Sequence, residues 1–357
     1  MRKELSIGRD EKKNIKIYLE KSGFLDHDRD DLQLSSGEQN FLSLAFEFLR
    51  ARNAPQPVVV LDDPISSFDS IYKNKVVYAI AKILEKKQRI ILTHNIDMIR
   101  LLDAQYKKSF KMYLLNNTEN EINGFVSLKF AEQDMLINLS ELLAAFRSKV
   151  PPSIVDEDLY LMSMIPFMRG YANICNKQAV YEELTKVMHG YMIEPVDIAA
   201  MYHELFDTID NDGNKVVVPV AESYSTNVDE ILKRSVDGHD IVDTEKYPLL
   251  NKTLKHTFIY LSLRLMVERT LVNKFAIDTI KYMQLGQIID KSLAGDTDES
   301  KRMRMKLTSK KTLINEFNHF EGNLSIFQPA IDITDTALGK EKTDILSLME
   351  RVKILGS

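Results

Sequence analysis

Two apolar, β-branched runs separated by one amphipathic stretch restrict the fold of this 357-residue chain more than any other feature. The runs are PVVVLD at 57–62 and RIILTH at 89–94, and both are apolar as in strands buried on both faces of a sheet. Between them, Val76, Ile80 and Leu84 recur at helical spacing. The pattern therefore predicts two parallel strands joined by a crossover helix, the unit of an α/β layered fold.

The pattern changes at about residue 131. Further strands are expected at 110–115 and 125–130, whereas long amphipathic helices follow, for example at 138–150, 254–285 and 343–355. One interruption, DTIDNDGNKVVVPVAE at 207–222, combines turn residues with an apolar run and is expected to form a small hairpin or an ordered loop. The predicted fold class is an α/β domain over 1–130, with a parallel βαβ core, followed by a mostly helical domain over 131–357.

The composition narrows the function classes. Lys and Arg number 47 against 52 Asp and Glu, and the net charge of −5 excludes a globally basic nucleic-acid coat. Cys175 is the single cysteine and is expected to be a small buried side chain, while Met162, Met164 and Met168 are expected in a core or interface. Because no stretch has the roughly 20 apolar residues of a membrane span, a soluble, cytoplasmic protein is expected.

Four short motifs follow one another in the first hundred residues: LSSGEQN at 34–40, VVVLDD at 58–63, SSFD at 66–69 and LTH at 92–94. A buried strand that ends in two acids fixes carboxylates where Mg²⁺ and a nucleotide need them, with Asp62 on the metal and Asp63 polarising a water. A helix that opens at Ser35, Ser36 and Gly37 offers amides and hydroxyls to an anion. Each motif alone is also consistent with an ordinary strand-end turn or helix cap.

Taken in this order, the motifs resemble the C-terminal half of an ABC-type ATPase head of the kind found in SMC and Rad50 proteins. The sequence LDDPISSFDS followed by ILTHN is similar to the corresponding motifs in ATPases of bacterial defence systems, namely the anticodon-nuclease and Septu-type groups. The resemblance implies a signature motif at Ser35, Ser36, Gly37 and Glu38, a Walker B strand ending at Asp62 and Asp63, a D-loop with Asp69 and a switch histidine at His94. It also implies ATP and Mg²⁺ as ligands, and a dimer of two heads.

The sequence departs from that family in two places. The hydrolytic base, glutamate in most such ATPases, is Asp63 here. None of the 13 glycines begins the G-x-x-x-x-G-K-[ST] run of a phosphate-binding loop, and the nearest candidate has Thr334 for the first glycine and Glu341 for the hydroxyl residue. We therefore expect a second head or another chain to carry the Walker A lobe.

In the helical domain, Arg264 and Glu268 lie four residues apart on one helix face, and His319 follows at a distance. A base and a cation suffice to cleave RNA without a metal, and the anticodon nucleases carry an Arg-x-x-x-Glu pair and a distant His. Arg264, Glu268 and His319 thus form a candidate ribonuclease triad, with the basic run 301–311 guiding a tRNA backbone. The alternative is an intrahelical ion pair and a solvated basic face.

Two functions are left open by these patterns. In one, an ATP-dependent anti-phage defence protein uses its ATPase head to control a helical domain that cleaves tRNA. In the other, the chain is a non-catalytic ATPase regulator whose helical surface docks a separate nuclease or toxin effector. An SMC-like role in chromosome maintenance is disfavoured because the chain has no long heptad repeat.

Overall fold

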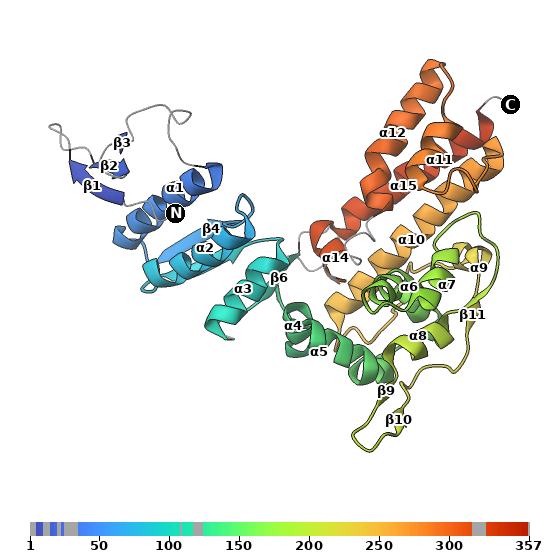
Figure 1. Cartoon of the computed structure of the whole chain (residues 1–357), viewed down its shortest axis with the longest axis horizontal. Helices are drawn as coiled ribbons and strands as arrows, with labels where there is room; N and C mark the ends of the chain where they lie inside the picture. The colour runs from blue at the N-terminus through green and yellow to red at the C-terminus, as the bar shows by residue number, and fades with distance from the viewer. Residues whose placement is uncertain are drawn as a thin grey trace. The chain divides into compact units, whose positions relative to one another are not determined.

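The computed structural model describes residues 5–9, 15–19, 23–24, 35–107, 109–116, 124–315 and 326–355. The chain divides into two compact units, Met1–Gln105 and Tyr106–Ser357 (Figure 1). The domain boundary expected from the sequence, between residues 130 and 131, stays a prediction.

The first unit opens with a three-stranded antiparallel sheet in the order β1-β2-β3. Its strands are β1 (Leu5–Arg9), β2 (Ile15–Leu19) and β3 (Gly23–Phe24). After it comes helix α1 (Ser36–Asn53), whose first turn is stabilised by a reciprocal cap between Ser35 and Glu38. Helix α1 packs against helix α2 (Ser70–Ile83).

The predicted parallel pair is present. Strand β4 (Val58–Asp62) pairs with strand β5 (Gln88–Leu92) in parallel, in a register that places Asp62 opposite Leu92. Helix α2 connects them and buries Val76, Val77 and Ile80, so the crossover helix is confirmed. Helix α3 (Ile96–Tyr106) follows β5 directly. No larger parallel sheet is formed by the described residues.

The expectation that both strands are buried on both faces is wrong. Val58, Val60 and Ile90 are exposed, Val60 by 58 %, whereas Val59 and Leu61 are partly buried. Alternate residues of a strand point to opposite faces, so one face of the β4–β5 pair is covered and the other is open among the described residues. An apolar strand sequence shows that both faces favour contact with apolar groups. It does not show which element of the fold covers each face.

The second unit begins with an antiparallel hairpin and a run of short helices. Strand β6 (Tyr113–Asn116) pairs with β7 (Gly124–Ser127). Helices α4 (Phe130–Ile137) and α5 (Leu139–Ala144) follow, and α5 continues into a π-helical turn at Ala145–Lys149.

Three helices that contact one another follow: α6 (Glu157–Ile174), α7 (Gln178–Lys186) and α8 (Ile198–Phe206). Met162, Met164 and Met168 are buried in α6, as the sequence predicts for core residues. Cys175 lies just past the end of α6 and is exposed, so the expectation of a buried thiol is wrong. The helix ends there, and its last residues no longer face the core.

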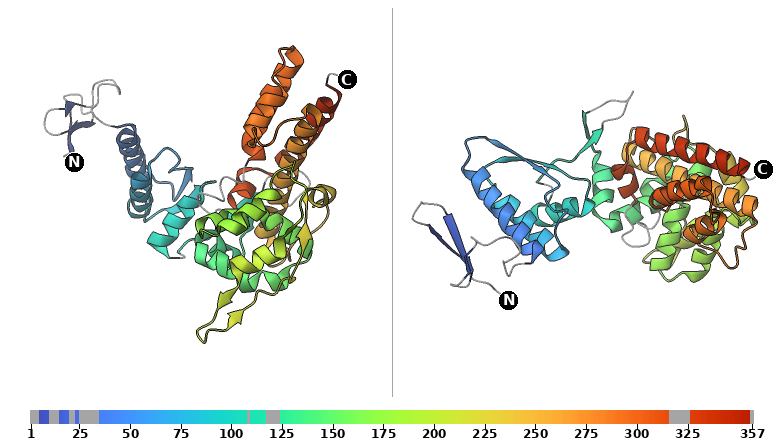
Figure 2. Two further views of the ribbon diagram at one scale, coloured as in Figure 1. Left: turned by 45° about the vertical axis from the view of Figure 1, so that its right-hand side comes forward. Right: turned by 90° about the horizontal axis from the view of Figure 1, so that it is seen from above.

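The segment expected to be a hairpin or a loop forms a hairpin that projects from the unit, as the views in Figure 2 show. It consists of β9 (Thr208–Ile209) and β10 (Lys215–Val216), and its turn is closed by the Asp210 carboxylate, which accepts hydrogen bonds from the amides of Asp212 and Asn214. A second short pair joins β8 (Val196–Asp197) to β11 (Ser225–Thr226), followed by helix α9 (Val228–Lys233).

The long helix α10 (Pro248–Phe275) is the centre of the second unit, because it contacts α6, α9, α11, α12, α14 and α15. Pro248 begins it at a position where a missing N–H costs nothing, and Ala276 ends it in the left-handed conformation. The C-terminal half of α10 shares one apolar core with α11 (Leu285–Ser292), α12 (Asp298–Ile314) and α15 (Asp335–Ile354). Helix α14 (Gln328–Asp332) also contacts α10. Among the described residues, no helix combines the length and the apolar character needed to cross a bilayer.

Candidate functional site

Two motifs of the first unit meet at the carboxyl ends of β4 and β5: the acidic motif that follows β4 and the histidine motif that follows β5. Thr93 Oγ1 donates a hydrogen bond of 2.9 Å to Asp63 Oδ1. His94 Nδ1 lies 3.6 Å from the other carboxylate oxygen, Oδ2. The Asp63 side chain is 22 % exposed and that of His94 is 64 % exposed, so the pair lies at the surface with its carboxylate partly sheltered.

The backbone around Asp63 is held in an uncommon conformation. Asp63 has a φ of 40°, in the left-handed region that non-glycine residues rarely adopt. Its amide donates to the Leu92 carbonyl at 2.7 Å, which continues the strand pairing by one residue, and its own carbonyl accepts from the Ser66 amide and hydroxyl. Strain of this kind persists where the surroundings impose it, and such positions cluster at functional sites.

The structure also locates the acids assigned to metal and D-loop roles. Asp62 is the last residue of β4 and its side chain is exposed. Asp69 is exposed at the N-cap of α2, where its side chain makes no capping hydrogen bond. Mg²⁺ is typically bound by one or two carboxylates together with water and substrate phosphates, and the exposed oxygens of Asp62 fit that donor set. The described residues contain no group of three or more His, Cys, Asp or Glu side chains that could hold a metal ion.

The Ser-Ser-Gly-Glu motif caps helix α1. The Ser35 amide and hydroxyl both donate to Glu38 Oε2, at 2.9 and 3.1 Å, and the Glu38 amide donates back to Ser35 Oγ. Ser36 and Gly37 form the first turn, whose amides have no acceptor within the helix. A Cβ on Gly37 would lie 3.6 Å from the Tyr72 ring, so α2 flanks this helix end closely. The motif keeps the geometry of an anion-binding helix start.

Thr93 is the residue of this candidate site that the sequence motifs do not single out. In the sequence, Thr93 is only the middle residue of the LTH run. In the structure, its hydroxyl donates to Asp63 Oδ1 and accepts a hydrogen bond from the Asn95 amide. A strand followed by a hydroxyl residue next to His94 is the only local signal for this contact, and it becomes informative once the parallel register of β4 and β5 is known.

In the second unit, Arg264 and Glu268 meet as the spacing predicts. Arg264 Nη2 lies 3.3 Å from Glu268 Oε1, and Arg264 Nη1 donates a 2.7 Å hydrogen bond to Asn315. The Arg264 side chain is 14 % exposed and that of Glu268 is fully buried. The catalytic role of the pair stays a prediction.

Glu268 fastens the loop between α7 and β8 to α10. Its Oε2 accepts a 2.9 Å hydrogen bond from the Gly190 amide and lies 3.3 Å from His189 Nδ1. Gly190 approaches α10 so closely that a Cβ would lie 2.1 Å from the Leu265 carbonyl oxygen. Burial, and then the Glu268 charge, raise the pKa of Tyr191 to about 12, against the opposing effect of Arg264. The carboxylate is thus enclosed by protein groups that hold it in place.

The third residue of the candidate ribonuclease triad, His319, lies outside the described residues. Asn315, at the end of α12, is the described residue nearest to it in sequence before the gap, and Asn315 contacts Arg264. On α12 itself, Lys301 pairs with Asp296, and Lys310 pairs with Glu341 and Asp344. Arg302, Lys306 and Lys311 are exposed on the same helix.

One comparison with known proteins bears on the first of these sites. Residues 9–148 match the family model of an AAA domain. The matched segment supports an AAA-type ATPase and includes every residue of the four motifs from Ser35 to His94, whereas Arg264, Glu268 and His319 lie outside it. An AAA ATPase domain implies nucleotide binding, usually with Mg²⁺. No curated protein and no solved structure matches the chain.

Proposed function

We propose that the chain is part of an ATP-hydrolysing head in which Asp63 activates the attacking water. The observation that carries this proposal is the meeting of Asp63, Thr93 and His94 at the ends of two parallel strands. This is where ligands bind in open α/β sheets. The AAA domain match over the same residues supports it.

Each side chain at this site has a different role in the proposed hydrolysis. Thr93 holds Asp63 Oδ1, so Oδ2 is the oxygen that accepts the proton of a water. His94, largely exposed beside it, is suited to donate a hydrogen bond to a terminal phosphate. Mg²⁺ bound with ATP neutralises phosphate charge, and Asp62 would hold its water shell. The first turn of α1, at Ser36 and Gly37, would receive a phosphate of the nucleotide held by a second head.

The loop that grips the β- and γ-phosphates is proposed to come from another polypeptide or another segment. No such sequence is present among these residues, as the glycine pattern shows. The open apolar face of β4 and β5, with Val58, Val60 and Ile90, supports an arrangement in which a further lobe covers this face of the sheet. Two such heads would then sandwich ATP and form a dimer.

The test is ATP hydrolysis by the full-length protein together with the polypeptide that carries the phosphate loop. Asp63→Asn should lower kcat by at least about a hundredfold while ATP remains bound, because the water loses its base. Glu85→Gln, which removes one exposed carboxylate at the opposite end of the parallel pair, is the matched control and should leave kcat unchanged. Equal hydrolysis by the wild type and the Asp63→Asn variant would overturn the proposal.

For the second unit, the complete burial of Glu268 favours the non-catalytic function, in which an anti-phage ATPase docks a separate nuclease or toxin. A base or a phosphate-binding group has to reach its substrate, and Glu268 is instead bound to Gly190 and His189. Cleavage of tRNA by Arg264, Glu268 and His319 is the competing proposal. For this cleavage, the contacts of Glu268 with Gly190 and His189 would have to break before the carboxylate could reach an RNA substrate.

RNA integrity after induction distinguishes the two proposals. The chain is expressed with the polypeptide that carries the phosphate loop, as wild type and as the variants His319→Ala and His239→Ala, the second being the control for loss of a histidine. Intact tRNA in every sample, with ATP hydrolysis retained, is expected for a docking role. Discrete tRNA fragments that disappear only in His319→Ala would contradict it and establish the ribonuclease.

A further inference from the structure

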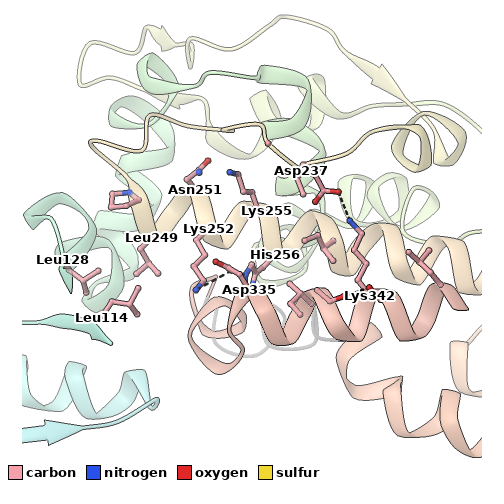
Figure 3. A pocket seen from close by; sticks show the side chains of 18 of the residues that line it. Leu114, Leu128, Asp237, Leu249, Asn251, Lys252, Lys255, His256, Asp335 and Lys342 are labelled. Atoms are coloured by element: carbon pink, nitrogen blue, oxygen red, sulfur yellow. Dashed lines mark hydrogen bonds and ion pairs between the residues drawn. The ribbon is translucent and has the colours of Figure 1, made fainter. Parts of the chain in front are cut away.

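A second candidate site lies wholly within the helical unit. A cavity of about 760 Å³ opens between α10, α15, the 236–238 loop and the β6–β7 hairpin (Figure 3). Its volume is within the usual range for small-molecule pockets. The motifs of the first unit and the buried Arg264–Glu268 pair take no part in it, and residues 236–259 and 335–346 supply most of its lining.

The two ends of this cavity differ in chemistry. Leu114, Leu128 and Leu249 gather at one end in Figure 3. Lys342 with its partner Asp237 lies toward the other, where Leu338 and Leu346 of the same helix also line the cavity. No Phe, Tyr or Trp side chain is among the described residues that line the cavity. A nucleobase, which binds proteins largely by stacking on aromatic rings, is therefore a poor fit, whereas an aliphatic body fits the leucine end.

The cations of the cavity are more buried than the carboxylates that neutralise them. Lys252, Lys255 and Lys342 are 17, 27 and 32 % exposed, and their partners Asp335, Asp240 and Asp237 are 37, 48 and 72 % exposed. An exposed ion pair usually leaves both charges in water. Here most of each lysine side chain is covered by protein, and in such surroundings an additional anion would be stabilised more strongly than at the surface.

The lining also has unused capacity for hydrogen bonds. A lysine ammonium has three N–H donors. Within the described part of the chain, Lys255 donates only to Asp240, at 2.9 Å, and Lys342 only to Asp237, at 3.0 Å. The almost fully buried His256 bonds through Nε2 to Asp335, while its Nδ1 has no hydrogen-bond partner among the described residues. With Asp240 included, each of the three lysines is paired with one aspartate, so an anion would be bound by the N–H donors that these pairs leave unused.

We infer that this cavity binds a small organic anion with an aliphatic body. The carboxylate or phosphate group lies beside Lys255 and Lys342, and the aliphatic part lies against Leu114, Leu128 and Leu249. The anionic group and the aliphatic part contact side chains of α10, α15 and the β6–β7 hairpin, so the bound ligand connects these three elements.

The experiment is titration calorimetry on the full chain with four probes: octanoate, octyl phosphate, octylammonium and inorganic phosphate. Octanoate or octyl phosphate should bind with one site per chain, and the stronger of the two identifies the anionic group. Inorganic phosphate, which lacks the aliphatic body, and octylammonium, which carries the wrong charge, should each bind at least tenfold more weakly. Binding of octylammonium equal to that of both anions, or no binding of either anion, would overturn the inference.

Variants locate the site. Lys255→Met combined with Lys342→Met should weaken anion binding at least tenfold, whereas Lys246→Met combined with Lys353→Met, the same charge change at exposed positions outside the lining, should not. Leu346→Trp, at a half-exposed lining position, should block the cavity without removing a charge. Thermal unfolding of each variant verifies folding, and unchanged binding in both the double lysine variant and Leu346→Trp would contradict the assigned location.

Discussion

The Gly190 amide donates a 2.9 Å hydrogen bond to the buried carboxylate of Glu268, at a point where the loop backbone touches helix α10. This contact joins the loop before β8 to the central helix of the second unit. It depends on the absence of a side chain at position 190 and on a charge at position 268, and the two requirements can be tested separately.

The first test is Gly190→Ala. Its Cβ would lie 2.1 Å from the Leu265 carbonyl oxygen and 2.8 Å from the Arg269 amide nitrogen, so the loop has to move away from α10. We expect a loss of about 3 kcal/mol or more in the free energy of unfolding, measured by urea denaturation. Gly339→Ala, in the exposed first turns of α15 with no atom within 4 Å of the new Cβ, is the control and should be neutral or slightly stabilising.

The second test is a double-mutant cycle on Arg264→Met and Glu268→Met. Each single change leaves the other charge buried without its partner and should destabilise the chain by roughly 3 to 5 kcal/mol. The double variant should recover a large part of that loss, because no unpaired charge remains. Purely additive effects in urea denaturation would show that the two side chains do not interact.

The third test concerns Glu132, which is buried in α4 and accepts a 2.8 Å hydrogen bond from the Leu250 amide at the start of α10. Burial raises the pKa of this carboxyl to about 7, although the amides of Leu250 and Leu249 oppose the shift. Between the ordinary pKa and 7 the folded chain therefore binds more protons than the unfolded chain, and stability falls as pH rises through this range.

Glu132→Gln keeps a hydrogen-bond acceptor for the Leu250 amide and removes the titrating group. The variant should lose this pH dependence, and at pH 8 it should be more stable than the wild type by up to roughly 3 kcal/mol. Urea denaturation at pH 5, 6, 7 and 8 measures the difference. The control is Glu141→Gln, at an exposed carboxylate on α5, which should follow the wild-type curve.

The fourth test asks whether Thr93 positions Asp63. Thr93→Val removes the 2.9 Å hydrogen bond to Asp63 Oδ1 while keeping the shape of the side chain, and it should lower kcat for ATP hydrolysis about tenfold to a hundredfold with little change in KM. Thr93→Ser retains the hydroxyl and should restore most of the rate. A loss that Thr93→Ser does not restore would point to packing in place of positioning.

Local patterns in the sequence predict the βαβ unit well. The bounds of β4, α2 and β5 follow from apolar runs and helical spacing, which are properties of neighbouring residues. The one-sided burial of Val60 and Ile90 does not follow, since it depends on which element covers the sheet. The exposure of Cys175 likewise depends on where α6 ends relative to the core.

In the candidate sites too, local patterns predict some features, whereas others depend on contacts between residues far apart in the sequence. Motif order finds Asp63 and His94, and the parallel register then places them together. The partners of Glu268, by contrast, are His189 and Gly190, which are far from it in sequence and carry no pattern that points to α10. Glu132 and the amide of Leu250 are related in the same way. Long-range hydrogen bonds of single residues leave no periodic signal for sequence analysis to detect.

The left-handed backbone at position 63 limits which residue types this position accepts. With a φ of 40°, β-branched and bulky side chains would be strained, whereas Asp and Asn are the non-glycine residues that adopt this region most readily. Asparagine is therefore the substitution that removes the charge with the least change in backbone preference. Glutamate, the usual residue of the resembled ATPases, would extend the carboxylate by one methylene and meet a less favourable backbone. The short acid at this position is thus matched to the turn that carries it, and engineering a longer one would require remodelling of that turn.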